Sequence, residues 1–553
     1  RRSRDAADLT MFVLETREEW FELSKLSRQF LDNKKLTKSG TDFAQRVAQV
    51  VEGSHYKWVD EVVYKKEKNP KKAAEEFIKF VGEFPKSENA DRALTYAMII
   101  FQDANELDRG VEAGERVLKE YPQSNFELKV RYTLASFYEK LAEFRKSAAM
   151  YEAFVAAYDD EVKDGEEAAK KAKAKGKAAP AKVAAKPGAE DAEGKRARKA
   201  AERKAMVAEA AEWVSDALFN AGVWWDGVGE SQKAITAYNA YMSRFKDRKD
   251  VPQVAYSIAL VHEKDGKWAD AAKAFASFTD TYGRDARTSP SQHYVARYHE
   301  MLAWRQLKDT RNAERIQGEL VRGWKGLPEQ ARQDTDALNA YAHARFLDLE
   351  PSWKRYTDIR FTRVATIRRD LANKQREIQR LEKEYAGVLA TGSGEWGIAA
   401  LTRIGLAYAD FARNIMDSPD PQGLDEDQKA MYRGELENLA MPLEEKSAEA
   451  LDKALAKAYE LSLYNEWTLA AQEQVNKYKP GSYAQVRKVD FRGSEFFATA
   501  DVLKDPGVPG STTVPAAAPT PATESPAAPS SQDSGAPPTQ PEAAAPTVGE
   551  VLS

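Results

Sequence analysis

The chain contains no cysteine among its 553 residues, which excludes disulfides, iron–sulfur clusters and thiol nucleophiles. Only five histidines are present, and none stands in an H-E-x-x-H pattern, so no zinc site is expected. No apolar run approaches the roughly 18–20 residues that cross a bilayer. The net charge is −4, whereas nucleic-acid-binding domains usually carry a strongly basic surface. We therefore expect no cofactor, no transmembrane segment and no nucleic-acid partner.

The remaining composition fits a helical stack with a large solvated surface. Hydrophobic residues make up 42% of the chain and charged residues 31%, with a mean hydropathy of −0.63. The chain begins Arg1-Arg2-Ser3-Arg4 without methionine, which favours a processed or partial form and leaves open whether a signal peptide or further repeats precede Arg1.

A repeat of 37 residues organises the first half of the chain. An aromatic residue closes an apolar stretch at Phe84, Tyr121 and Tyr158, and again at Phe245 and Tyr282. The gap between the two groups equals one period plus about 50 residues, which indicates an insertion. A fixed period in this range is typical of stacked repeats, in which each unit buries its apolar face against its neighbours.

Each unit carries the same helical pattern before its closing aromatic residue. A small residue lies eleven positions earlier, and bulky residues usually follow it after four and seven positions, on one helix face. These slots hold Ala73, Gly110, Ser147, Ala234 and Ala271, then Phe77, Gly114, Tyr151, Tyr238 and Phe275, then Phe80, Val117, Phe154, Tyr241 and Phe278. A preceding helix carries Met98, Ala135, Gly222 and Ala259, each followed three positions later by Phe101, Tyr138, Trp225 and His262. His262 is therefore assigned to packing.

This pairing of helices resembles the tetratricopeptide repeat, whose usual length is 34 residues. The resemblance covers residues 69–285 with one interruption, and it implies an all-α solenoid of helix-turn-helix units. We expect the three extra residues in the connections around 85–89 and 122–125. Gly114 departs from the pattern, as do Asp159, Lys246 and Gly283 in place of the terminal proline.

The resemblance further implies a binding scaffold for a protein or peptide, with no enzymatic activity. The first helix of each unit would line a concave surface. Within those helices we predict Tyr96, Tyr132, Trp224 and Tyr256 as partner-binding groove residues, and we assign Trp225 to the core by its slot.

The predicted organisation has eight segments: an N-terminal helical region (1–68), repeats (69–158), a Lys/Ala-rich flexible insertion (159–205), repeats (206–285), degenerate helical repeats (286–350), a long heptad helix (351–391), a C-terminal helical module (392–504) and a disordered Pro/Ala/Ser/Thr tail (505–553). The insertion lacks aromatic residues, and the tail cannot bury enough apolar surface to offset its ordering entropy.

The heptad helix is predicted to run unbroken from Tyr356 to Leu389. Its apolar residues recur in steps of three and four, with Lys374 at one core position. Two interpretations fit this pattern: a helix packed on its own domain, or a self-associating coiled coil. Beyond it we predict helices at 394–417, at 425–436, and at 443–478 in one or two pieces.

Gly392, Gly394 and Gly397 match the G-x-G-x-x-G spacing of dinucleotide sites. That motif requires a preceding strand, and a charged helix precedes it here. We therefore predict a helix stop at Gly392 and a new helix with Ser393 as its N-cap.

The segments 392–408 and 419–424 resemble the C-terminal region of large tetratricopeptide-repeat proteins of the deltaproteobacterial (myxobacterial) cell envelope, which include components of the adventurous gliding-motility machinery. Residues 442–446 and 465–467 add to this likeness. It implies a periplasmic or outer-membrane-associated scaffold in a multiprotein complex, with a cytoplasmic location as the alternative.

The Lys-rich insertion supports a second hypothesis. Between residues 161 and 210, Lys and Arg outnumber acidic residues, and charge alone is enough for weak contact with an anionic polymer or membrane. The protein would then be an architectural linker that uses the heptad helix and the basic insertion to bind an anionic envelope polymer or lipid.

Overall fold

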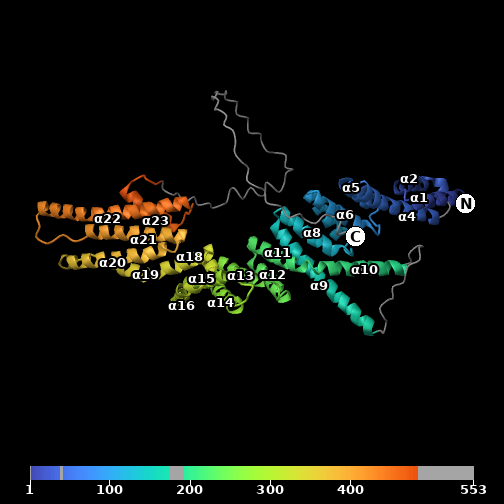
Figure 1. Cartoon of the computed structure of the whole chain (residues 1–553). Coiled ribbons are helices and arrows are strands. Elements are labelled where there is room, and N and C mark those ends of the chain that lie inside the picture. The colour runs from blue at the N-terminus through green and yellow to red at the C-terminus, as the bar shows by residue number, and fades with distance from the viewer. Residues whose placement is uncertain (1, 38–40, 175–191, 484–553) are drawn as a thin grey trace, which may run out of the picture. The chain divides into compact units, whose positions relative to one another are not determined.

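The computed structural model describes residues 2–37, 41–174 and 192–483, and every regular element within these ranges is a helix (Figure 1). These residues fall in one compact unit, 1–485. The middle of the insertion, the end of the C-terminal module and the predicted tail lie outside the described residues.

The N-terminal region consists of α1 (Arg2–Thr16), α2 (Trp20–Asp32), α3 (Lys34–Thr37) and α4 (Thr41–Lys57), which continues into a π-helical segment, η1 (Trp58–Lys66). Trp20, Leu23, Phe43 and Val47 form its small apolar core. Segment η1 packs on α5 (Pro70–Glu83), so this region joins the first repeat directly.

The repeats form the predicted tetratricopeptide-like solenoid of helix pairs. After α5, the second helix of its unit, the pairs are α6 (Ala90–Asp103) with α7 (Leu107–Glu120), α8 (Glu127–Lys140) with α9 (Phe144–Ala174), α11 (Val214–Gly227) with α12 (Ser231–Arg244), and α13 (Val251–Lys264) with α14 (Trp268–Tyr282). Each helix packs against its neighbours in sequence, as stacked repeats require.

The turn inside each pair is short and uses a left-handed residue. Asn105, Ala142, Gly229 and Gly266 all have positive φ angles, between 56° and 79°. The next amide bonds back to the carbonyl five residues earlier, as from Glu106 to Phe101 at 2.8 Å. This is the Schellman pattern of helix ends. The longer connection lies between pairs, at 84–89 and 121–126, where the extra residues were expected.

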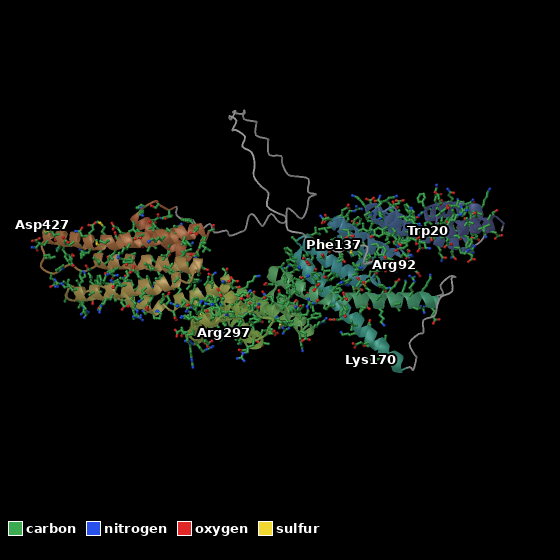
Figure 2. The ribbon with its side chains drawn as sticks, viewed as in Figure 1. Trp20, Arg92, Phe137, Lys170, Arg297 and Asp427 are labelled. Carbon is green, nitrogen blue, oxygen red and sulfur yellow. The ribbon has the colours of Figure 1, made fainter. Side chains whose placement is uncertain are left out.

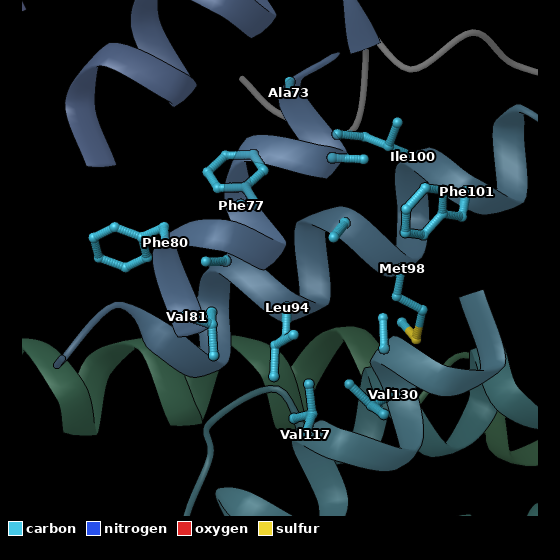
Figure 3. Close-up of a cluster of buried hydrophobic side chains, with 14 of the residues drawn as sticks. Ala73, Phe77, Phe80, Val81, Leu94, Met98, Ile100, Phe101, Val117 and Val130 are labelled. Carbon is cyan, nitrogen blue, oxygen red and sulfur yellow. The ribbon is translucent and has the colours of Figure 1, made fainter. Parts of the chain in front are cut away.

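The core explains both the recurring slots of the repeat and the exception at Gly114. Phe77, Phe80 and Phe101 are buried among aliphatic side chains between α5 and α8 (Figure 3). At Gly114, a Cβ atom would lie 2.8 Å from both Leu134 Cδ2 and Met98 Sδ. These two side chains fill the space that an aromatic residue occupies in other units, so the departure at Gly114 preserves the packing.

The insertion, which we expected to be a solvated excursion with helical ends, is helical on both sides of its middle. Helix α9 continues 16 residues past Tyr158 to Ala174, where Lys170 marks the extension in Figure 2, and a further helix, α10 (Ala192–Ala210), follows. Contacts join α10 to α8 and α9. Alanine, lysine and glutamate are strong helix formers, so these ends fold as helices despite the absence of aromatic residues.

The degenerate repeats comprise α15 (Pro290–Gln306) and α16 (Thr310–Gly323), a 3₁₀ turn at Trp324–Gly326, α17 (Glu329–Arg332), α18 (Thr335–Leu347) and α19 (Glu350–Thr357). The prediction of one helix from Tyr356 to Leu389 is wrong. Helix α19 ends at Thr357, a 3₁₀ turn spans Val364–Thr366, and α20 begins at Ile367 and ends at Leu389.

Lys374 gives the physical reason for this break. Its ammonium group donates to the carbonyl oxygen of Ile359, just beyond the end of α19, at 2.9 Å, and to that of Tyr356 at 3.4 Å. The heptad seam of α20 packs within the chain against α21 (Gly394–Met416), as the first interpretation of the pattern required. Its side chains at Ile378, Leu381, Tyr385 and Val388 are at most 1% exposed.

The C-terminal module contains α21, α22 (Glu426–Glu460) and α23 (Glu466–Tyr478). Gly392 has a φ of +86°, and the Ser393 hydroxyl accepts from the Trp396 amide, so the predicted stop and N-cap are confirmed. The predicted interruption between 436 and 443 is wrong, because α22 runs through Pro442. Proline has no N–H to donate to the carbonyl of Asn438, and Asn438 is exposed.

Candidate functional site: the exposed face of the first helices

Each first helix presents one face that stays partly open to solvent. Its third, seventh, tenth and fourteenth residues share this face, and all but Thr133 are half-buried or exposed. We call these residues the first-helix stripe. In order of helix they are Arg92, Tyr96, Ile99 and Asp103; Lys129, Thr133, Ser136 and Lys140; Asp216, Asn220, Val223 and Gly227; Gln253, Ser257, Leu260 and Lys264.

Side chains bridge neighbouring first helices along this face. Lys264 Nζ on α13 lies 3.1 Å from Asp226 Oδ1 on α11. On the next helix, α15, Gln292 donates to Gln253 at 2.5 Å and His299 Nδ1 lies 2.8 Å from a Glu263 oxygen. These contacts place α11, α13 and α15 beside one another, through Gln253 and Lys264 of the stripe and residues next to it.

The four predicted groove residues take different positions on these helices. Only Tyr96 belongs to the stripe, where its ring meets Phe77 edge-on at 6.0 Å. Tyr132 and Tyr256 hold the sixth position of their helices and pack edge-on against Phe154 and Phe275 of the paired second helices.

Trp224 holds the eleventh position of α11 and packs against the preceding helix pair, α8 and α9. Its ring stacks on Phe144 at 4.5 Å, and its indole N–H lies 3.4 Å from Glu139 Oε2. Trp225 is 3% exposed, in keeping with its core slot. The sixth and eleventh positions are five residues apart, a step that turns a helix by about 500°, so side chains at these positions point roughly 140° apart around the helix axis. The structure therefore does not gather the four residues on one face, and their contact with a partner stays a prediction.

Sequence reasoning missed every stripe residue except Tyr96, and the residues at the tenth position show why. Ile99, Ser136, Val223 and Leu260 recur with the same 37-residue period and the same gap at the insertion. The 37-residue period was therefore enough to identify these four positions as equivalent. Aromatic character selected Tyr132, Trp224 and Tyr256 instead, and in this chain aromatic rings mainly fill the space between paired helices.

Arg92, on the stripe, contacts both an acidic residue of α10 and an aromatic ring. Its guanidinium donates to Glu202 Oε1 of α10 at 2.8 Å and lies 5.6 Å from the centre of the Phe126 ring. Burial raises the pKa of the neighbouring Tyr96, while the charge of Arg92 opposes that rise. Around Arg92, the surface beneath α10 thus combines a cation with aromatic rings.

A cluster of rings joins the repeats to the C-terminal module. His343 on α18 stacks on Trp396 of α21, with ring centres 3.7 Å apart and planes 8° apart. Its Nδ1 lies 2.6 Å from the Tyr298 hydroxyl of α15. Burial, and then the charge of Arg305, lowers the pKa of His343 to about 3.

This pKa predicts acid sensitivity. The unfolded chain, with a histidine pKa near 6.5, binds more protons than the folded chain between pH 6.5 and 3. Stability from His343 is therefore complete above pH 6.5 and declines as the pH falls towards 3, by at most about 1.4 kcal/mol per pH unit. We expect His343→Phe, which keeps the stack on Trp396, to flatten this decline in urea unfolding followed by Trp fluorescence. An unchanged pH slope would contradict the assignment.

The C-terminal module contains one further surface feature, an open cleft. An open cleft of about 760 Å³ lies between α21, α22 and α23, where Arg413, Lys477 and Glu445 are among its lining residues. Within the ranges that the structure describes, no three His, Asp or Glu side chains are grouped to hold a metal ion. None of the helices there is long and apolar enough to cross a membrane.

The helix pairs and their shared stripe define a tetratricopeptide-like repeat protein. No protein-family model matches the chain, and no curated protein matches it. The solved structures similar to it include a tetratricopeptide-repeat protein from Parabacteroides merdae, with 12% identity, a TM-score of 0.27 and coverage of 64% of this chain and 98% of that one.

A second similar structure is PilW, a type IV pilus biogenesis factor, with 12% identity, a TM-score of 0.22 and coverage of 51% of this chain and 97% of that one. A third is a protein with such repeats from Bacteroides fragilis, with 15% identity, a TM-score of 0.24 and coverage of 47% and 97%. At these TM-scores, the fold assignment rests on the helix pairs of the chain itself.

Proposed function

We propose that this protein is a non-enzymatic scaffold that holds a protein or peptide partner along the first-helix stripe. The observation that carries the proposal is the recurrence of that stripe on α6, α8, α11 and α13, together with the contacts at Lys264, Gln253 and His299 that join α11, α13 and α15. A stack of this kind offers pre-formed contacts along its length, so binding costs little reorganisation.

Obstructing the stripe is expected to weaken partner capture without unfolding the chain. Ser136→Arg and Ser257→Arg place long charged side chains on half-buried positions of α8 and α13. Together they should reduce the partner recovered by affinity capture from the native cell about tenfold, which corresponds to about 1.4 kcal/mol of binding free energy.

Ser243→Arg is the matched control, because Ser243 is exposed on the second helix α12, away from the stripe. It should leave capture unchanged, and circular dichroism should show that all three variants remain helical. If the stripe variants capture the same partners in the same amounts as the control, the stripe is not the binding surface.

We further propose that the scaffold works in a multiprotein complex of the bacterial cell envelope, in the periplasm or at the outer membrane. The support is the likeness of residues 392–408 and 419–424 to envelope proteins, including those of gliding motility. Fractionation of the native cell should place the protein in the periplasmic or membrane fraction. Recovery in the cytoplasmic fraction alone would contradict this setting.

The linker hypothesis requires both the heptad helix and the basic insertion to be available for binding, and the heptad helix is not. The seam of α20 is occupied by α21, so it offers no free surface for self-association in this packing. The basic insertion retains exposed cations on α10, and contact with an anionic polymer or membrane stays a prediction.

A further inference from the structure

Helix α10 crosses the N-terminal ends of two first helices. Near its C-terminus, Glu209 pairs with Lys129 of α8 at 3.4 Å. Further along, Glu202 pairs with Arg92 of α6 at 2.8 Å. Near its N-terminus, Lys195 lies 3.6 Å from Glu88, in the connection before α6. Arg92 and Lys129 are both stripe residues, so α10 lies over one end of the stripe.

Charged and polar groups hold most of this helix. Besides those three pairs, Arg203 Nε donates to Glu161 of α9 at 2.7 Å, and the Asn125 amide donates to the Lys199 carbonyl at 3.2 Å. Apolar contact is confined to the last turns, where Met206, Val207 and Ala210 reach the core cluster. Between Lys195 and Lys204, all residues except the half-buried Glu202 are exposed.

Such contacts are individually weak. Pairs between partly exposed charges contribute about 0–1 kcal/mol each, and salt screens them. Ala210 is buried and Met206 and Val207 are half-buried against the hydrophobic core, so the last turns stay anchored by contacts that cost more to open. The two ends of α10 therefore differ in how easily they separate from the repeats, and the end that lies over Arg92 is the weaker one.

We propose that α10 is a charge-held strap that covers the Arg92 end of the stripe and lifts from it, hinged near Met206, to admit a partner. Glu202 acts as an internal ligand of Arg92, so a partner segment with a carboxylate at that position replaces the contact that the strap gives up. The partner role rests on the proposed scaffold function, whereas the lifting of the strap is a property of the chain alone.

The test is hydrogen–deuterium exchange on the isolated full chain, followed by mass spectrometry. Raising NaCl from about 0.1 to 1 M shortens the Debye length from about 10 to about 3 Å. Amides of residues 195–204 should then exchange about fivefold faster, while those of α6 and α7 stay protected. Arg92→Glu and Glu202→Arg should each produce the same acceleration at low salt, and the double variant, which restores an opposite-charge pair, should slow exchange again.

Arg116→Glu is the matched control, because Arg116 pairs with Glu120 on α7 at 2.9 Å, away from α10. It should leave exchange in 195–204 unchanged. Exchange there that responds to neither salt nor charge reversal would overturn the strap, as would equal acceleration in α6 and α7. Since the measurement needs no partner, such a result leaves the scaffold proposal to be decided by the Ser→Arg variants.

Discussion

Replacing Asp410 by alanine is expected to destabilise the C-terminal module by about 3–5 kcal/mol, because it leaves the charge of Lys374 buried without its partner. Lys374 is 0% exposed, and its ammonium lies 2.6 Å from Asp410 Oδ2. Burial already lowers the pKa of this lysine, and the hydrogen bond that its ammonium donates to Asp410 is the main opposing influence. Hydrogen exchange of α20 amides at pH 7 measures the loss locally.

Two further variants separate a buried-charge effect from general damage. The double variant Lys374→Met and Asp410→Leu removes both charges, and buried pairs replaced in this way are often neutral or stabilising, so most of the protection should return. Glu449→Gln disrupts the exposed pair with Lys453 on α22 and should cause no measurable change. Near-normal protection in the Asp410→Ala variant would show that Lys374 does not depend on this carboxylate.

Truncating Phe77 to alanine is expected to cost about 3–5 kcal/mol in the first repeats, since it removes a buried ring and leaves a cavity. Phe77, labelled in Figure 3, is 0% exposed, and its ring meets those of Tyr56 and Tyr96 at distances of 5.8 and 6.0 Å. In a stack stabilised by nearest-neighbour contacts, the damage should stay local. Exchange should accelerate in α5, α6 and α7 while α20 and α21 remain protected.

Phe12→Ala provides the control, because Phe12 on α1 is 64% exposed and makes no comparable core contact. It should leave exchange in α5–α7 unchanged. If Phe77→Ala behaves like this control, the slot assigned to Phe77 by the repeat does not carry the packing.

The repeat itself was predictable because one local rule recurs along the chain. The slots around Phe77, Tyr238 and Phe275 fix which helix face is buried, and the structure places all three in the core. The N-cap at Ser393 was also predictable, because Gly392 and Ser393 act through their own backbone and side chain.

The errors arose where distant residues decide the local structure. The sequence from Tyr356 to Leu389 is a good helix pattern, but the ammonium of Lys374 pairs with carbonyls at the end of α19 and with Asp410, 36 residues further on. At Pro442 the helix continues, and Asn438, whose carbonyl loses its helical partner there, is exposed. Neither condition is visible in a window of neighbouring residues.

The candidate site was only partly predictable for a different reason. The repeat period specifies which residues share a face, and it would have placed Ile99, Ser136, Val223 and Leu260 together. The prediction weighted aromatic character instead, and only Tyr96 met both criteria. The covering of Arg92 by α10 depends on ion pairs across 110 positions of sequence, which no local pattern contains.

Site-specific photo-crosslinking tests the scaffold claim most directly. A photoreactive amino acid is placed at Ser136 or Ser257 on the stripe, and at Ser243 on the second helix α12 as the control. In the native cell, the stripe positions should crosslink to the same partner protein and the control position should not. Crosslinking at Ser243 with none at Ser136 or Ser257 would show that partners bind the opposite face, and would contradict the account.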